Sequence, residues 1–290
     1  MILHLSNKFK KPERVIVLGS SGFISSNVIE LLKKNKINYL PFNRKKLDLT
    51  KKSSKNKLIK ILKKNDTILF VAADAPVKNE EMFLNNIKMC NNVCSAINRK
   101  QIKHLVYVSS DAVYSDTKKR ISEYSKTLPQ SLHGLMHLCR EEMLKNSFDG
   151  PFCIVRPTLI YGKKDPHNGY GPNRFIRLAK KNISIKLFGH GEELRDHVYI
   201  EDVSKIIYEI LIKQSIGVIN IATGQVVSFM KIAKTIKSIL KSKSKIIKTK
   251  RIGKMPHGGY RAFNTELSSK MFPSIKYTPI YSGFSRVIKS

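Results

Sequence analysis

Short apolar runs alternate with helix-like segments along most of this chain. Each run is almost wholly apolar, and the segments between the runs repeat apolar residues at helical spacing. A strand without polar residues is buried on both faces, as in a parallel sheet covered by helices. The pattern predicts an α/β fold, a Rossmann-type doubly wound parallel sheet with a smaller C-terminal substrate lobe. The runs occupy residues 15–19, 38–42, 66–73, 104–110, 152–156 and 217–222.

The chain changes character after residue 161, where polar turn formers interrupt the alternation. Residues 163–173 are rich in Gly, Pro, Asn and Asp, and residues 189–197 form a second polar stretch. We expect a dinucleotide-binding domain and a smaller substrate-binding lobe that closes over the carboxyl edge of the sheet. The first is predicted at residues 12–161 plus about 197–222, and the second at about 162–196 plus 223–290.

The first apolar run ends in a turn with two glycines, Gly19 and Gly22, before a helical segment. Glycine allows positive φ and a close approach of backbone N–H groups to a phosphate at a helix N-terminus. The third glycine of a full dinucleotide fingerprint is Ser25 here, so a plain strand–helix connection is the alternative. The residues predicted to contact a dinucleotide at this turn are Gly19, Ser21, Gly22, Phe23 and Ile24.

The second apolar run ends without the acidic residue that commonly holds the ribose 2′-hydroxyl of NAD. Arg44 follows this run instead, and a guanidinium suits a 2′-phosphate. This favours NADP over NAD, with an exposed loop arginine as the alternative.

Length and composition indicate a globular protein. The chain has 290 residues, 41% of them hydrophobic, which is enough to bury a substantial core. No apolar run approaches the roughly 20 residues of a membrane helix, and the first eleven residues do not resemble a secretory signal, so we expect a cytoplasmic protein. The four cysteines lack paired spacing and are expected to be buried free thiols: Cys90, Cys94, Cys139 and Cys153.

The formal net charge of +33 raises the question of a nucleic-acid partner. Most of the 54 basic residues are lysines spread along the chain with few aromatic residues among them. This distribution favours a solvated surface and makes nucleic acid an unlikely partner. The same field attracts an anionic small-molecule substrate.

A series of short motifs follows the glycine turn in a fixed order. They lie at residues 48–50 (DLT), 71–73 (VAA), 106–114 (VYVSSDAVY), 156–162 (RPTLIYG), 195–203 (RDHVYIEDV) and 220–224 (NIATG). Together they resemble the extended short-chain dehydrogenase/reductase family, the NAD(P)-dependent epimerase/dehydratase group that acts mostly on nucleotide sugars. The resemblance runs from about residue 14 to about residue 278.

The resemblance implies roles for individual residues around a cofactor. Asp48, with Leu49 beside it, resembles the acid that contacts the adenine amino group. Ala72 and Ala73 resemble the wall behind the adenosine, and Asn86 stands where the family often has an asparagine in the next helix.

Two residues of the 106–114 motif resemble catalytic positions. Ser110 lies where the family has the Ser or Thr that hydrogen-bonds the reacting hydroxyl. Asp111 matches an acid that the dehydratases use for proton transfer, but the adjacent glutamate of those enzymes is Ala112 here. The resemblance therefore supports dehydration less well than epimerisation or reduction.

The family's Tyr-x-x-x-Lys catalytic motif is replaced by His133-x-x-x-His137. Three interpretations are open. His133 could move the substrate proton, since imidazole titrates near pH 7, while His137 contacts the nicotinamide ribose. The site could instead bind nucleotide without turnover. Residues four apart on a helix could also hold a metal with Glu141, although no third ligand is firmly placed and we expect no metal.

The resemblance also implies substrate contacts. Arg195 and Arg261 match arginines that bind the pyrophosphate of a nucleotide sugar, and Asn173 matches an asparagine at the start of a substrate-lobe helix. Leu159 replaces a common family asparagine. We therefore predict an enzyme that transfers hydride on a sugar or nucleotide sugar. The resemblance also implies a homodimer through residues 82–98 and 135–144. A degenerate nucleotide- or RNA-binding protein on the same fold is the alternative.

Overall fold

The core of the computed structural model is a mostly parallel sheet. The structure describes residues 2–6, 10–166 and 168–289. Within these residues the sheet has seven strands, all parallel to their neighbours except β1, which runs antiparallel to β10. The strand order is β1 (Leu3–His4), β10 (Ser215–Ile221), β6 (Phe152–Pro157), β5 (His104–Val108), β4 (Asp66–Phe70), β2 (Arg14–Leu18) and β3 (Tyr39–Phe42).

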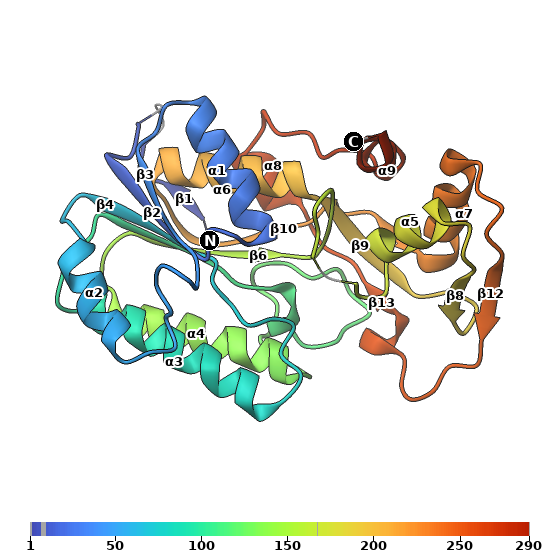
Figure 1. The fold of residues 1–290 in the computed structure, drawn as a ribbon, viewed down its shortest axis with the longest axis horizontal. Coiled ribbons are helices and arrows are strands. Elements are labelled where there is room, and N and C mark those ends of the chain that lie inside the picture. Colours follow the sequence, from blue (N-terminus) through green and yellow to red (C-terminus); the bar gives the residue numbers. More distant parts are fainter. Residues whose placement is uncertain (1, 7–9, 167, 290) are drawn as a thin grey trace.

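Helices cover both faces of this sheet, which confirms the predicted doubly wound α/β fold (Figure 1). Alternate residues of one strand enter two separate cores: Val15 and Val17 face one helical layer, and Ile16 and Leu18 face the other. This two-sided burial is why the strands are apolar throughout. One layer holds α1 (Phe23–Lys34) and α6 (Ile200–Lys213), and the other α2 (Ser53–Ile61), α3 (Glu80–Ile97) and α4 (Leu132–Ser147).

Two details differ from the sequence expectation. The strand β1 was not expected, because a two-residue edge strand has no detectable period. It is held by His4, whose ring contacts Ser215 Oγ at 2.8 Å and the Met271 carbonyl at 2.9 Å. The apolar spacing of the sequence predicts a short amphipathic helix at residues 58–64, whereas helix α2 occupies Ser53–Ile61, with Ser54 and Leu58 as its buried residues.

The C-terminal half adds a smaller group of elements at the carboxyl end of β6. Strand β7 (Leu159–Tyr161) follows β6 almost directly and pairs with β9 (Leu194–Tyr199). A separate core forms here between Phe175, Phe229 and Ile236. The remaining elements are α5 (Pro172–Lys180), β8 (Ile185–Phe188), β11 (Val226–Ser228), α7 (Phe229–Leu240), β12 (Ile246–Thr249), β13 (Tyr260–Arg261), α8 (Glu266–Met271) and α9 (Ile280–Lys289), with 3-10 turns at Asp111–Val113 and Pro256–Gly259.

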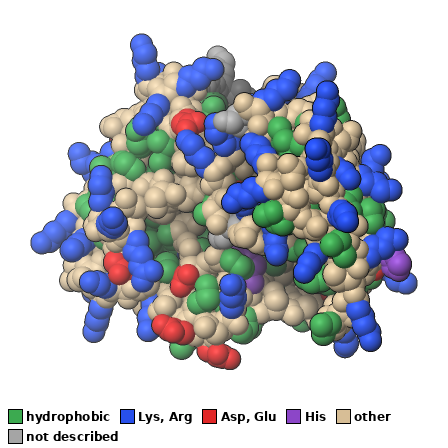
Figure 2. Space-filling model, turned by 45° about the vertical axis from the view of Figure 1, so that its right-hand side comes forward, with side chains coloured by type: hydrophobic (Ala, Val, Ile, Leu, Met, Phe, Trp, Pro, Cys, Tyr) green, Lys and Arg blue, Asp and Glu red, His purple; other side chains and the backbone are tan. Residues whose placement is uncertain are grey.

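Basic side chains are distributed rather than gathered. Figure 2 shows Lys and Arg over the whole of the visible face, without one continuous stripe. Within the described part of the chain, every helix is too short or too polar to cross a membrane. All four cysteines are free, as expected; Cys90, Cys94 and Cys153 are buried, whereas Cys139 is half-buried.

Candidate active site

The glycine turn (residues 19–22) ties three strands together at the carboxyl edge of the sheet. Gly19 has a φ of +93°, and a Cβ placed there would lie 2.6 Å from the Ala72 backbone nitrogen. The N–H groups of Gly19 and Ser20 both donate to the Phe42 carbonyl, at 2.8 and 3.0 Å. Only glycine fits this combination of backbone angle and close approach.

Helix α1 begins directly after this turn, and its N-terminus has no capping side chain. Gly22 is the N-cap residue, and the first turn contains no acidic residue. The first N–H groups and the positive end of the helix dipole are therefore available to a phosphate. Ser25, at the position of the missing third glycine, is fully buried. The turn and helix start thus fit a dinucleotide, whose diphosphate Gly19, Ser21, Gly22, Phe23 and Ile24 would surround.

Arg44 lies just beyond β3, the strand next to this turn. Its side chain is 73% exposed, and Nε lies 3.8 Å from Asp48 Oδ2. The other Asp48 oxygen accepts hydrogen bonds from the Thr50 hydroxyl and backbone nitrogen, which lower the pKa of this carboxyl. Leu49 is buried in the core beneath. The guanidinium is thus accessible to a ligand, and the acid beside it is ionised.

The turn after β4 forms the opposite wall. Ala72 is half-buried there, next to the Gly19 turn, whereas Ala73 is exposed. Asn86 is fully buried, and its amide is saturated by the Asp74 backbone, at 3.0 and 2.8 Å, and by the Met82 carbonyl at 2.8 Å. In this arrangement Asn86 shapes the wall, and a direct cofactor contact from it stays a prediction.

Helix α4, which carries the predicted catalytic residues His133 and His137, begins against the turn that follows Ser110. Ser131 caps this helix by accepting from the Gly134 N–H at 3.1 Å. A Cβ on Gly134 would lie only 2.0 Å from the Ala112 carbonyl oxygen. The missing side chain thus lets the start of α4, which carries His133, pack against the turn Asp111–Val113.

The two histidines of α4 lie on adjacent turns of the helix, with their rings edge to face. Their ring centroids lie 4.8 Å apart with the planes at 88°. Nδ1 of His133 accepts from the Val77 N–H at 3.5 Å, the long limit of a hydrogen bond. His137 is almost fully buried, and its Nδ1 lies 2.8 Å from the Tyr107 hydroxyl. Tyr107, within an apolar strand, was not among the site residues predicted from the sequence.

Arg140 was also missed. It is completely buried on α4 and donates to the Ala72 carbonyl at 2.9 Å and to Asn86 Oδ1 at 3.3 Å. Its guanidinium carbon lies 4.3 Å from the Phe70 ring centroid and 5.1 Å from that of Tyr107. The helical spacing Met136, Arg140, Leu144 places it on the buried face of α4, and that spacing is the signal that could have identified it.

A buried polar network supports the loop from behind. Glu141 receives Arg156 at 2.9 and 2.5 Å and the Ser109 hydroxyl at 2.5 Å. Arg156 also donates to the Tyr114 hydroxyl at 2.9 Å. Glu141 is therefore engaged away from the two histidines. Nowhere in the described ranges do three or more His, Cys, Asp or Glu side chains form a group that could hold a metal.

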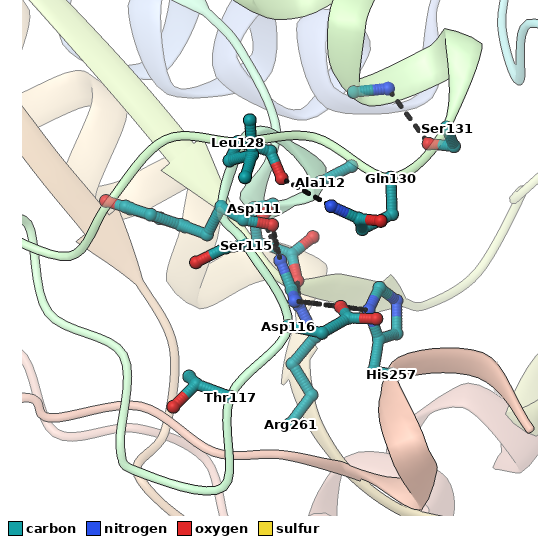
Figure 3. Close-up of polar contacts among 12 residues, drawn as sticks. Asp111, Ala112, Ser115, Asp116, Thr117, Leu128, Gln130, Ser131, His257 and Arg261 are labelled. Carbon is teal, nitrogen blue, oxygen red and sulfur yellow. Dashed lines mark hydrogen bonds and ion pairs between the residues drawn. The ribbon is translucent and has the colours of Figure 1, made fainter.

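A charged cluster, formed by Asp111, Asp116, His257 and Arg261, lies on the substrate side (Figure 3). Arg261 is 1% exposed and donates to Asp111 Oδ2 at 2.9 Å, to the Asp111 carbonyl, and to Asp116 at 3.3 Å. His257 contacts the same Asp116 oxygen at 2.5 Å. The predicted acid Asp111 and the predicted phosphate ligand Arg261 are thus paired with each other.

Arg195 lies on β9, close enough to this cluster to be influenced by Asp111 and Arg261. It is 8% exposed, and no described residue forms a hydrogen bond or ion pair with its guanidinium. Burial lowers its pKa. Asn173, at the start of α5, accepts from the Gly162 N–H at 3.2 Å and donates to Asp165 at 2.5 Å. Arg195 is therefore the cation best placed to accept an incoming anion.

The comparisons with known proteins agree with this geometry. The family model described as "NAD dependent epimerase/dehydratase family" matches residues 15–222. An uncharacterized UDP-glucose epimerase, YtcB, of Bacillus subtilis is 27% identical over 251 residues, which cover 81% of this chain and 78% of that protein. The trifunctional UDP-glucose 4,6-dehydratase, 3,5-epimerase and reductase RHM3 of Arabidopsis thaliana is also 27% identical, over 73% of this chain.

The chain spans only 37% of the length of that plant protein. Among solved structures, the UDP-glucose 4-epimerase of Thermotoga maritima with UDP-glucose superimposes with a TM-score of 0.83. That match covers 95% of this chain and 97% of the other at 18% identity, so it shows a shared fold.

Proposed function

We propose that this chain, which belongs to the NAD-dependent epimerase/dehydratase family, is an enzyme that transfers hydride between NAD(P) and a carbon of a nucleotide sugar. The observation that carries the proposal is the edge-to-face pair of histidines on α4, a helix that begins against the loop of Ser110 at Gly134. In the sequence resemblance this pair takes the place of the family's Tyr and Lys, and the glycine turn fits a dinucleotide.

The bound cofactor would supply the carbon that accepts or returns the hydride. Ser110 would hydrogen-bond the reacting hydroxyl. His133 would take the hydroxyl proton at Nε2 as hydride leaves the substrate carbon, and return it to the carbonyl oxygen when hydride comes back. To act as this base at Nε2, the neutral ring would carry its own proton on Nδ1 and would give up the long, 3.5 Å contact in which Nδ1 accepts from the Val77 N–H.

The substrate would be held through its phosphates. Arg195 is buried and has no partner among the described residues, so a diphosphate would remove the free-energy cost of an unpaired buried cation. Similar proteins act on UDP-glucose by name, which makes UDP-sugars the first candidates. Asp111 would need to leave Arg261 before it could act on a substrate proton, because the two are paired at 2.9 Å.

A reconstruction experiment tests this function. Purified protein, NAD or NADP and UDP-glucose are expected to give turnover that His133→Ala abolishes. The double variant His133→Tyr, His137→Lys restores the family's residues on an unchanged helix and is expected to keep activity. If wild-type protein binds the cofactor but turns over no nucleotide sugar, while the double variant does, the histidine site is a degenerate one.

The cofactor preference is proposed to be NADP. Arg44 is an exposed cation just beyond β3, and within the described residues its one ion pair is the 3.8 Å contact with Asp48. Ligand binding raises the melting temperature by mass action. NADP is therefore expected to raise the melting temperature more than NAD does, and Arg44→Ala is expected to remove this difference. The control Arg99→Ala, at another exposed arginine, is expected to keep the difference. Equal shifts from both cofactors in wild-type protein would refute the preference.

We also propose a homodimer through α3 and α4. Leu84, Leu132 and Leu135 on these helices are 54%, 38% and 40% exposed, which is unfavourable for large apolar side chains in water. Light scattering is expected to show a dimer that Leu84→Lys weakens. A monomer at micromolar concentration would exclude it.

A further inference from the structure

The buried face of helix α4 carries a cation, Arg140, with which no described carboxylate forms an ion pair. Arg140 has no exposed surface, and its guanidinium meets a carbonyl, an amide oxygen and two aromatic rings. An uncompensated buried charge is costly. The electric field of this cation acts on the polar groups around it, and two of these groups are the side chains of Tyr107 and His137.

Tyr107 and His137 lie within that field. The Tyr107 hydroxyl and His137 Nδ1 are 2.8 Å apart, and both residues are almost completely buried. The groups that face His137 are His133 and Arg140 on its own helix and Tyr107 on β5. The two ring nitrogens of an imidazole point in nearly opposite directions. With Nδ1 held against the Tyr107 hydroxyl, Nε2 points away from that hydroxyl.

The charges around the pair determine which partner donates. Burial, then His133 and then Arg140, lower the pKa of His137 well below its usual value, so the ring is neutral near pH 7. Burial also raises the pKa of Tyr107, although Arg140 opposes this, so the phenol keeps its proton. We therefore expect the Tyr107 hydroxyl to donate the hydrogen bond and Nδ1 of the neutral His137 ring to accept it.

We propose that Tyr107 is a positioning residue for the active site. Its hydroxyl donates to Nδ1 of His137 and fixes the tautomer that carries its proton on Nε2. That N–H is then presented to the cofactor ribose, where a hydroxyl oxygen accepts it. The inference rests on the proposed function, since it assumes that His137 faces the cofactor. A neutral N–H donor thereby replaces the ammonium group of the family's lysine.

The experiment compares Tyr107→Phe with Tyr161→Phe. Both remove a buried hydroxyl and keep the ring, but the Tyr161 hydroxyl has no hydrogen-bond partner in the described chain. Nitrogen-15 NMR of the histidine rings, assigned with His137→Gln, reports the tautomer. Wild type and Tyr161→Phe are expected to show His137 with the proton on Nε2. Tyr107→Phe is expected to show a mixture, with cofactor bound about 2- to 10-fold more weakly, the effect of one hydrogen bond.

Each outcome separates this inference from the proposed function. An unchanged His137 tautomer in Tyr107→Phe, or the same change in Tyr161→Phe, overturns the positioning role. A changed tautomer with unchanged cofactor affinity shows that His137 does not face the ribose, which also overturns it. If the tautomer and the affinity both change but wild-type protein turns over no sugar nucleotide, the positioning role stands and the proposed enzyme activity fails.

Discussion

The cofactor side of the site is built from backbone groups, whereas the substrate side is built from charged side chains. On the cofactor side, the glycine turn, the start of α1 and the wall at Ala72 offer N–H groups and space. On the substrate side, the charged cluster binds its own members, and Arg195 alone among the predicted phosphate ligands has no partner in the described chain.

This difference separates two ways of binding an anion. A backbone turn keeps its shape whether or not a ligand is present, so its contribution is set during folding. Charged side chains exchange partners, and a ligand must compete with the pairs that already exist. The cofactor side is thus expected to respond to changes in volume, and the substrate side to changes in charge.

The largest loss of stability is expected at the buried pair of Glu141 and Arg156, which lies between the cofactor side and the substrate side. Glu141→Ala leaves Arg156 buried without its carboxylate and releases Ser109 before the catalytic loop. The expected loss of unfolding free energy is about 3–5 kcal/mol, measured by urea denaturation. Glu142→Ala is the matched control, because its pair with Lys145 is exposed and contributes about 0–1 kcal/mol. Equal losses in the two variants would contradict a supporting role for the buried pair.

The second effect is a loss of stability at acid pH, caused by a buried histidine in the central sheet. Burial lowers the pKa of His104, on β5, to about 4, although its Nε2 contacts the Ser215 carbonyl. The unfolded chain titrates near 6.5, so it binds this proton more tightly than the folded protein does. Stability is therefore present above pH 6.5 and is lost as pH falls toward 4, by about 3 kcal/mol.

Denaturation at several pH values checks this expectation. His104→Gln should flatten the decline between pH 6.5 and 4, and the exposed His190→Gln should leave it as in the wild type. A decline of the same slope in all three proteins would assign the acid sensitivity to other groups.

The third effect tests the volume of the cofactor side. Gly19→Ala combines positive φ with a Cβ 2.6 Å from the Ala72 nitrogen, so it should cost about 2–3 kcal/mol and abolish cofactor binding. Gly253→Ala has the same backbone problem, at φ +82°, with no atom within 4 Å. It should cost about 1 kcal/mol and leave cofactor titrations unchanged. Cofactor binding retained by Gly19→Ala would remove the turn from the site.

The smallest effect tests the charges of the substrate side. Arg195→Met should weaken UDP binding about 10- to 100-fold without lowering the stability of the ligand-free protein, because no paired group is left behind. Arg261→Met should mainly lower stability, since Asp111 loses its partner. Calorimetric titration with UDP and denaturation of both variants measure this contrast. If Arg261→Met weakens UDP binding and Arg195→Met lowers stability, Arg261 is the phosphate ligand and Arg195 the structural residue.

The elements that the sequence predicted well depend on neighbouring residues. The parallel strands, their helices and the glycine turn each follow from a local period or from a short motif. The positions of His133 and His137 on one helix follow from their spacing of four residues. These features need no knowledge of what packs against them.

The features that the sequence did not predict depend on distant partners. Arg261 and Asp111 are 150 residues apart, so no local pattern marks them as a pair. Tyr107 lies in an apolar run and was interpreted as core, which it is; its hydroxyl matters only because α4 places His137 above it. Arg140 is one cation among many in a chain of charge +33, and only its burial distinguishes it.

The contact between Gly134 and the Ala112 carbonyl has a consequence for how this site can change. The contact is made by backbone on both sides, so it holds helix and loop together whatever side chains stand at positions 133 and 137. Substitutions at these two positions can therefore alter the proton-transfer chemistry while the frame around them is retained. In evolutionary terms, such a glycine gives a lineage room to exchange its acid and base, and we propose that the two histidines are one such exchange.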